Sequence, residues 1–198
     1  MLENISGYNL ILASNSPRRN ELMNGLGLKC SVKILKDVDE SYPENLKGPE
    51  VALYVAAKKA DAFRHHLKKN DLVITADTIV CVDDQVFGKP VDKADAIRML
   101  QSLSGRSHWV YTGVCLTGSK SQRSFTAATE VFFATLTKEE ILWYVERYKP
   151  FDKAGAYGVQ EWIGFVGVER ISGSYFNVMG LPVHKLYTEL KAFEPFCV

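Results

Sequence analysis

The chain has 198 residues, of which 46% are hydrophobic and 24% are charged, a composition that is ordinary for a folded globular protein and excludes a disordered one. Its 24 Lys and Arg residues and 23 Asp and Glu residues give a net charge of +1, which argues against binding to nucleic acid through bulk phosphate attraction. No apolar run is long enough to cross a membrane, so we expect no membrane span.

The first part of the chain is predicted to alternate short strands with helices. A buried strand over 8–13 leads into a helix that begins at Pro17, with Ser16 at its N-cap, and runs to about Leu26. A strand over 30–35 follows, and then an acidic, proline-containing loop over 37–49. A long helix is expected over 50–67.

The second part is predicted to contain longer strands. Two short strands over 71–74 and 79–82 are separated by residues 75–78, and a hairpin follows over 82–86. Thr137 and Glu140 form a capping box that opens a helix. The remaining predicted elements are a helix over 93–103, paired antiparallel strands over 108–116 and 124–133, a helix from Thr137 to Arg147 and a last helix over 182–190.

This order of elements favours a mixed α/β fold over a purely doubly wound sheet. No Pro/Gly/Ser-rich linker divides the chain, so we expect one domain over residues 1–198. The four cysteines lie too far apart for a CxxC pair: Cys30, Cys81, Cys115 and Cys197. Isolated cysteines of this kind are typical of small buried hydrophobes in a reducing compartment, which predicts a cytoplasmic location.

The junction between the first strand and the first helix is a candidate anion site. Two hydroxyl groups, of Ser14 and Ser16, and two guanidinium groups, of Arg18 and Arg19, converge where the helix begins. Helix N-termini and arginine forks both bind phosphate oxygens. A capped surface helix with a solvated arginine pair is the alternative interpretation.

Lys59 and Asp77 are the next candidates. Lys59 falls within the apolar stripe of the long helix, where a lysine either extends to solvent along the stripe's edge or points into a cleft. Asp77 lies at the end of one predicted strand and the start of another, where a carboxylate can hold Mg²⁺ or accept a proton from water. An aspartate that bonds only to its own turn is the alternative there.

Two later segments are weaker candidates. Lys89 lies in a Gly-Lys-Pro turn, which suits either a ligand or an exposed turn lysine. The segment 151–160 alternates small residues with Asp, Lys, Tyr and Gln, which suits close approach to a flat ligand or an ordinary loop. The chain contains no P-loop, zinc-protease or nucleophile-elbow motif.

Taken together, these segments resemble the Maf family of nucleoside triphosphate pyrophosphatases. The matching pieces follow the family's order over nearly the whole chain: LILASNSPRR at 10–19, VDE at 38–40, AKKA at 57–60, ADT at 76–78, GKP at 88–90, LSGRSH at 103–108, DKAGAYGVQ at 152–160 and VMGLP at 178–182. A single tripeptide would be weak evidence, but the ordered set is highly specific.

The resemblance implies a mixed twisted sheet with flanking helices, two lobes around a central cleft as in inosine triphosphate pyrophosphatases, and often a homodimer. It implies hydrolysis of a nucleoside triphosphate to the monophosphate and pyrophosphate with a divalent cation, Mg²⁺ or alternatively Mn²⁺ or Co²⁺. It also suggests links to the arrest of cell division.

The resemblance also assigns roles to individual residues. Asp77 matches the family's proton acceptor, and four further residues match the catalytic cleft: Ser14, Glu40, Lys59 and Lys89. Three positions match those linked to substrate choice, in the combination of the subfamily that acts on dTTP and UTP: Arg18, Thr78 and Gln160. The bulky Trp162 departs from many relatives; it either narrows specificity or forms an ordinary core or dimer contact, and we favour the contact.

These roles suggest a mechanism without a covalent intermediate. Asp77 and Glu40 would hold the cation, and Lys59, Lys89 and either Arg18 or Arg19 would offset the charge of the triphosphate during attack of water on the α-phosphorus. A nucleotide-binding regulator without turnover and a pyrophosphatase for another, modified nucleotide are the competing hypotheses.

Overall fold

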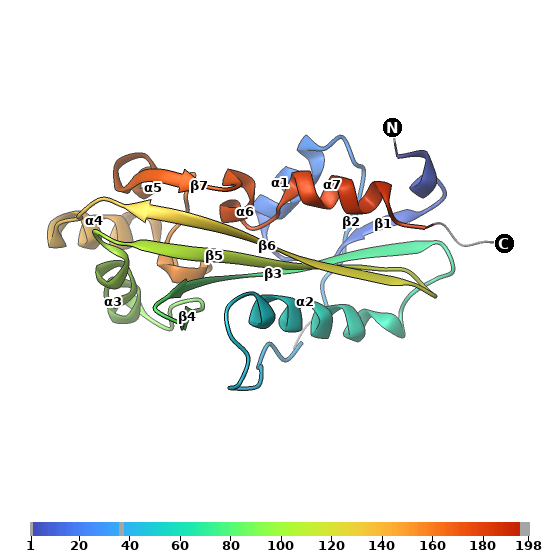
Figure 1. The fold of residues 1–198 in the computed structure, drawn as a ribbon, viewed down its shortest axis with the longest axis horizontal. Coiled ribbons are helices and arrows are strands. Elements are labelled where there is room, and N and C mark those ends of the chain that lie inside the picture. The colour runs from blue at the N-terminus through green and yellow to red at the C-terminus, as the bar shows by residue number, and fades with distance from the viewer. Residues whose placement is uncertain (1, 36–37, 195–198) are drawn as a thin grey trace. The chain divides into compact units, whose positions relative to one another are not determined.

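The computed structural model describes residues 2–35 and 38–194. Within these ranges, seven strands form one mixed sheet in the order β2-β1-β3-β5-β6-β7, and β4 pairs with β3 (Figure 1). Helices flank the sheet, which confirms the predicted mixed α/β class. Two residues on which predictions rest, Asp37 in the acidic loop and Cys197, lie outside the described ranges.

The strands pair in both directions. They are β1 Asn9–Leu12, β2 Ser31–Val32, β3 Asp71–Val82, β4 Gln85–Phe87, β5 Ser107–Thr117, β6 Gln122–Phe133 and β7 Val168–Ser172. β1 is parallel to β2 and β3, whereas β4 is antiparallel to β3 and β7 is antiparallel to β6. The strands β5 and β6 are neighbours joined by a tight turn, in which the Gly118 N–H donates to the Ser121 carbonyl at 2.8 Å, as expected for the predicted pair of strands.

The helices agree closely with the predicted ones in the first two thirds of the chain. They are α1 Pro17–Gly25, α2 Pro49–Arg64, α3 Lys93–Leu103, α4 Lys138–Tyr148, α5 Trp162–Gly167, α6 Tyr175–Met179 and α7 Val183–Lys191, with short 3-10 turns at Glu3–Ile5 and Ala154–Ala156. The capping box of Thr137 and Glu140 is present at the start of α4. Across the described ranges, no helix is both long and apolar enough to span a bilayer.

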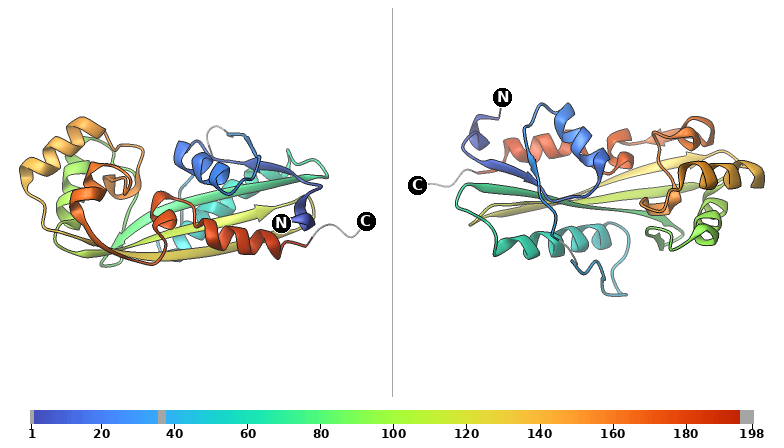
Figure 2. Two further views of the ribbon diagram at one scale, coloured as in Figure 1. Left: turned by 90° about the horizontal axis from the view of Figure 1, so that it is seen from above. Right: turned by 180° about the vertical axis from the view of Figure 1, so that it is seen from behind.

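The chain forms two compact units. Unit 1 contains residues 1–77, 112–127 and 180–198, and unit 2 contains residues 78–111 and 128–179. In unit 1, α2 covers one face of the strands, and α1 and α7 lie on the other face (Figures 1 and 2).

Unit 2 has its own core around β3–β6 and the helices α3 and α4. His108 and Tyr157 are buried there, with the His108 Nε2 2.8 Å from the Tyr157 hydroxyl, and both rings pack edge-to-face against Phe133. Burial lowers the pKa of His108 to about 3, so the imidazole is neutral at physiological pH. Trp162 packs against this core and lies beside Trp143, as expected for an ordinary core contact.

Three predicted strands had the wrong bounds. The strands expected over 71–74 and 79–82 are one continuous strand, β3, because Thr75 and Ala76 are buried between them and remain extended. The strand expected over 30–35 is reduced to Ser31–Val32 at the sheet edge. The side chains of Val32 and Ile34 are 44% and 53% exposed. A longer strand over 30–35 would therefore bury little apolar surface and gain little stability.

The segment 162–179 holds three elements that the sequence did not predict: α5, β7 and α6. They are five or six residues long, which is too short for a hydrophobic period to emerge. The cysteines agree with expectation in the described ranges, since Cys81 and Cys115 are buried free thiols and Cys30 is a half-buried one.

The position of α2 in unit 1 depends on close backbone approach to β5. A Cβ added to Gly113 of β5 would lie 2.4 Å from the carbonyl carbon and oxygen of Ala52. The hydroxyl of Thr75 in β3 donates to the Ala56 carbonyl at 2.8 Å, which joins the same helix to a second strand. Both contacts fix the height of α2 against the sheet.

Gly113→Ala should therefore destabilise the protein, because the new methyl group meets backbone atoms that cannot move without shifting the helix. We expect a loss of about 3 kcal/mol in the free energy of unfolding, measured by denaturant titration. Gly25→Ala is the matched control, since a Cβ there has no atom within 4 Å. Equal stability of the two variants would contradict this account of α2.

Candidate functional site

The turn between β1 and α1 has the expected form, but its serines act differently from the prediction. Ser16 occupies the N-cap position of α1 without a capping hydrogen bond from its side chain. Instead, the backbone N–H of Ser16 donates to the Ser14 hydroxyl at 3.2 Å. Pro17 is the first helical residue, as predicted.

Arg19 is a clamp within unit 1. Its Nε donates to the Gly180 carbonyl at 2.8 Å, and its Nη1 donates to the Ala76 carbonyl at 2.9 Å and to the Ser14 hydroxyl at 3.3 Å. Burial lowers the pKa of the guanidinium, an effect that the nearby carboxylate of Asp77 opposes. Arg19 thus ties the end of β1 and the strand before Asp77 to the segment that precedes α7.

The centre of the candidate site is an ammonium group between two carboxylates. The Nζ of Lys59 lies 2.7 Å from Oδ1 of Asp77 and 3.0 Å from Oε1 of Glu40. The side chains of Lys59 and Asp77 are only 16% and 15% exposed, whereas that of Glu40 is 49% exposed. Lys59 therefore points to the acidic pair instead of extending along the helix edge to solvent.

The sequence of α2 explains this placement of Lys59. Apolar residues at three- and four-residue spacing are buried against the sheet: Ala52, Val55, Ala56, Ala60 and Phe63. Lys59 lies at the border of this stripe, so burying the stripe brings the ammonium group to the middle of β3, where Asp77 lies.

A second lysine on α2 holds the loop that carries Glu40. The Nζ of Lys58 lies 2.6 Å from Oδ2 of Asp39 and donates to the backbone carbonyl of Ser41 at 2.9 Å and to the Ser41 hydroxyl at 3.2 Å. The backbone N–H and hydroxyl of Ser41 both donate to Asp39 at 2.8 Å. The bonds from Lys58 and Ser41 hold the pKa of Asp39 well below its usual range.

We call Lys58, Asp39 and Ser41 the loop clasp. The side chain of Lys58 is only 30% exposed. A signal for the loop clasp was present in the sequence as two adjacent lysines and two adjacent acids. Lys58 pairs with Asp39, and Lys59 pairs with Glu40.

The other candidate residues belong to unit 2. Thr78 follows Asp77 in β3, and Lys89 is an exposed residue after β4, next to Gly88, whose carbonyl accepts from the Gly155 N–H at 3.0 Å. Gln160 is half-buried, and its carboxamide oxygen is fully buried without a hydrogen-bond partner among the described residues.

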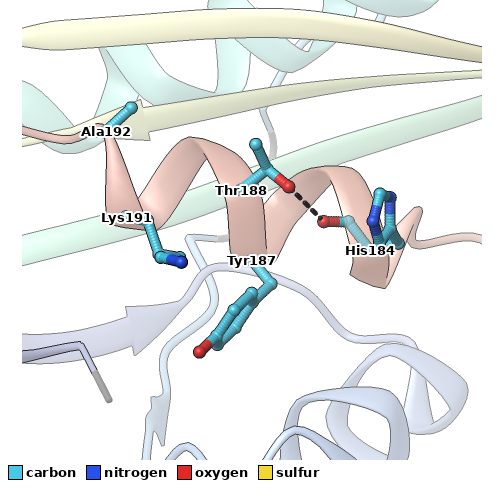
Figure 3. Close-up of a pocket in the computed structure, with 5 residues that line it drawn as sticks. All are labelled: His184, Tyr187, Thr188, Lys191 and Ala192. Carbon is cyan, nitrogen blue, oxygen red and sulfur yellow. Dashed lines mark hydrogen bonds between the residues drawn. The ribbon is translucent and has the colours of Figure 1, made fainter.

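Unit 1 also has a hollow of about 550 Å³ on α7, lined by His184, Tyr187, Thr188, Lys191 and Ala192. Figure 3 shows that the only bond drawn among these residues is that of the Thr188 hydroxyl to the His184 carbonyl, a local helical contact of 3.1 Å. None of the residues that line this hollow is among the candidate site residues.

The family model described as "Maf-like protein" matches residues 9–193. A dTTP/UTP pyrophosphatase of Phocaeicola vulgatus is 60% identical over 191 residues, which cover 96% of this chain and 99% of that protein. A dTTP/UTP pyrophosphatase of Parabacteroides distasonis is 50% identical over 193 residues, which cover 98% of this chain and 100% of that protein.

Among solved structures, the Ham1 protein of Staphylococcus aureus aligns with a TM-score of 0.50 at 18% identity, over 91% of this chain and 99% of that chain. At this identity the likeness concerns the fold alone, and it agrees with the mixed α/β architecture. The match of the family model over residues 9–193, together with the identity to full-length relatives, shows that the chain belongs to the Maf family.

Proposed function

We propose that this protein hydrolyses dTTP and UTP to the monophosphate and pyrophosphate. The observation that carries the proposal is the charged cluster of Lys59, Asp77 and Glu40, in which the Lys59 and Asp77 side chains are largely buried. The chain that holds it is 60% identical to a protein named dTTP/UTP pyrophosphatase. Buried acid–base clusters of this kind are typical of catalytic sites.

Asp77 is the proposed proton acceptor for the attacking water. Its carboxylate is largely shielded from solvent and is bonded to the Lys59 ammonium through Oδ1, which fixes the orientation of the group. A fixed carboxylate near the α-phosphorus removes the proton as the oxygen–phosphorus bond forms. Lys59 in turn offsets negative charge that develops on the phosphate oxygens.

The donor set suits a divalent cation that is shared with the substrate. The described residues contain no group of three or more His, Cys, Asp or Glu side chains arranged around one point. Mg²⁺ needs only one or two protein carboxylates, because phosphate and water oxygens complete its shell, so Asp77 and Glu40 suffice. Mn²⁺ and Co²⁺ are the alternatives; when bound, such a cation would neutralise phosphate charge and activate water.

Arg18, Ser14 and the N-terminus of α1 are the proposed phosphate contacts of unit 1, and Lys89 is that of unit 2. Arg19 stays a predicted substrate residue, although its bonds to two backbone carbonyls make it a support for the site first. Thr78 and Gln160 are the proposed base-selecting residues. The carboxamide of Gln160 can both donate to and accept from the edge of a pyrimidine base.

The same proposal includes a single functional domain over the whole chain, a homodimer and a cytoplasmic location. The free thiols of Cys30, Cys81 and Cys115 agree with a reducing compartment.

Pyrophosphate release from a nucleotide panel tests the function. The panel contains dTTP, UTP, CTP, 5-methyl-UTP, ITP and 7-methyl-GTP, each with Mg²⁺ or Mn²⁺. We expect release from dTTP and UTP, and a loss of about a hundredfold or more in kcat for Asp77→Asn, which keeps the shape of the side chain but cannot accept the proton. Asp61→Asn, an exposed acid on α2 paired with Arg64, is the control and should keep full activity.

The other outcomes are equally informative. Release only from a purine nucleotide would keep the reaction but overturn the proposed substrates. No release from any nucleotide by the folded protein would contradict the enzyme and favour a nucleotide-binding regulator. Full turnover by folded Asp77→Asn would remove Asp77 from its proposed role.

The loop clasp should affect activity through Glu40. Asp39→Ala and Lys58→Met each release the loop, so we expect the Mg²⁺ concentration for half-maximal activity to rise about tenfold, as for other residues that orient metal ligands. Asp61→Ala, which breaks an exposed ion pair on the same helix, should leave this concentration unchanged. If Asp39→Ala still raises it in an enzyme that already carries Glu40→Gln, the clasp does not act through Glu40.

A further inference from the structure

Gln160 lies in a tight turn whose ends are joined by one hydroxyl group. The backbone N–H of Glu161 donates to the carbonyl of Gly158 at 3.0 Å, which closes a turn with Gln160 as its third residue. The backbone N–H of Gly158 donates to the hydroxyl oxygen of Tyr144 at 3.0 Å. The same hydroxyl donates its proton to Oε2 of Glu161. Tyr144 thus bridges the first and last residues of the turn.

Tyr144 is well suited to fix this turn. It belongs to α4 and its side chain is fully buried. Burial, followed by the bond to the Glu161 carboxylate, raises the pKa of the phenol, so the hydroxyl keeps the proton that it donates. Removing a buried, hydrogen-bonded hydroxyl costs stability, because its partners lose a hydrogen bond that water cannot replace in the interior.

A buried charge completes the arrangement. The Nζ of Lys153 lies 3.0 Å from Oε1 of Glu161 and 2.8 Å from Oδ1 of Asp152, and the Lys153 side chain is only 9% exposed. Both oxygens of the Glu161 carboxylate are therefore bonded, one by Tyr144 and the other by Lys153. The carboxylate that ends the turn has little freedom to rotate.

The turn also has no room to shift. A Cβ on Gly158 would lie 2.8 Å from Cδ of Glu161, and a Cβ on Gly164 would lie 1.8 Å from the carbonyl oxygen of Val159. The Gly164 N–H donates to the Glu161 carbonyl at 2.8 Å, which packs α5 against the turn. A side-chain contact at Gly158 and a backbone contact at Gly164 thus restrict the turn.

We propose that Tyr144 is a specificity-determining positioning residue: it holds the 158–161 turn so that the carboxamide of Gln160 meets the pyrimidine edge in one orientation. This role rests on the proposed function. Uracil and cytosine differ in the donors and acceptors of that edge, and a fixed amide can match only one of the two patterns. A loosened turn would let the amide adjust to both bases, so discrimination falls while the reacting groups stay in place.

Tyr144→Phe tests this role, since it removes one oxygen atom and keeps the ring. The measurement is the ratio of kcat/KM for UTP to kcat/KM for CTP, which share the same sugar and triphosphate. We expect the ratio to fall about tenfold, because a small displacement of a positioned group costs this much or more. Tyr148→Phe is the matched control: Tyr148 is in the same helix, with its ring stacked on that of Tyr144, and its variant should keep the wild-type ratio.

A general loss of stability would lower both kcat/KM values together and leave the ratio unchanged, so folded Tyr144→Phe with an unchanged ratio overturns the role. If Tyr144→Phe does not fold, Glu161→Gln tests the other end of the bridge and must lower the ratio in the same way, or the role is overturned. In a Gln160→Ala enzyme, Tyr144→Phe should cause no further change in the ratio, and a further change would show that Tyr144 acts by another route.

The proposed function and the proposed role of Tyr144 can be contradicted separately. No pyrophosphate release by the wild-type protein overturns the proposed function and this role with it. Release by the wild-type protein with an unaltered ratio in the folded variants overturns the role of Tyr144 alone.

Discussion

The ammonium group of Lys59, held between the carboxylates of Asp77 and Glu40, is the constraint on which the site depends. The three residues come from different parts of unit 1: Lys59 from the helix α2, Asp77 from the middle of the strand β3 and Glu40 from an irregular loop. The helix is held by backbone approach at Gly113 and the bond from Thr75, and the loop is held by the clasp. Removing one partner from such a cluster would leave a charge poorly compensated in a largely buried place.

Both units use the same physical device, a charged or polar side chain that fixes the backbone beside a candidate residue. In unit 1, Arg19 donates to the carbonyl of Ala76, the residue before Asp77, and to the carbonyl of Gly180. In unit 2, Tyr144 bonds to both ends of the turn that carries Gln160. Asp77 and Gln160, which are proposed to act on the nucleotide, are thus held in place by Arg19 and Tyr144, whose hydrogen bonds are made within the protein.

The sequence predicted elements wherever a period or a cap was present. The apolar stripe of α2 was recognised from its three- and four-residue spacing, and the start of α4 from its capping box. The elements between residues 162 and 179 were missed because each is too short to show a period. β3 was divided in two because the polar residues at 75–78 suggested a turn, whereas burial of Thr75 and its bond to α2 satisfy that segment within a strand. Lys59 and Asp77 were candidates from pattern alone, but the clasp and the Tyr144 bridge depend on contacts between residues distant in sequence, which no local pattern encodes.

The most direct test of the account is to determine which phosphorus atom of the nucleotide is attacked by water. UTP is hydrolysed by the wild-type protein in ¹⁸O-labelled water with Mg²⁺, and both products are examined by mass spectrometry. Attack on the α-phosphorus predicts labelled UMP and unlabelled pyrophosphate. Label in pyrophosphate or in released orthophosphate would contradict the account, because water would then attack a different phosphorus.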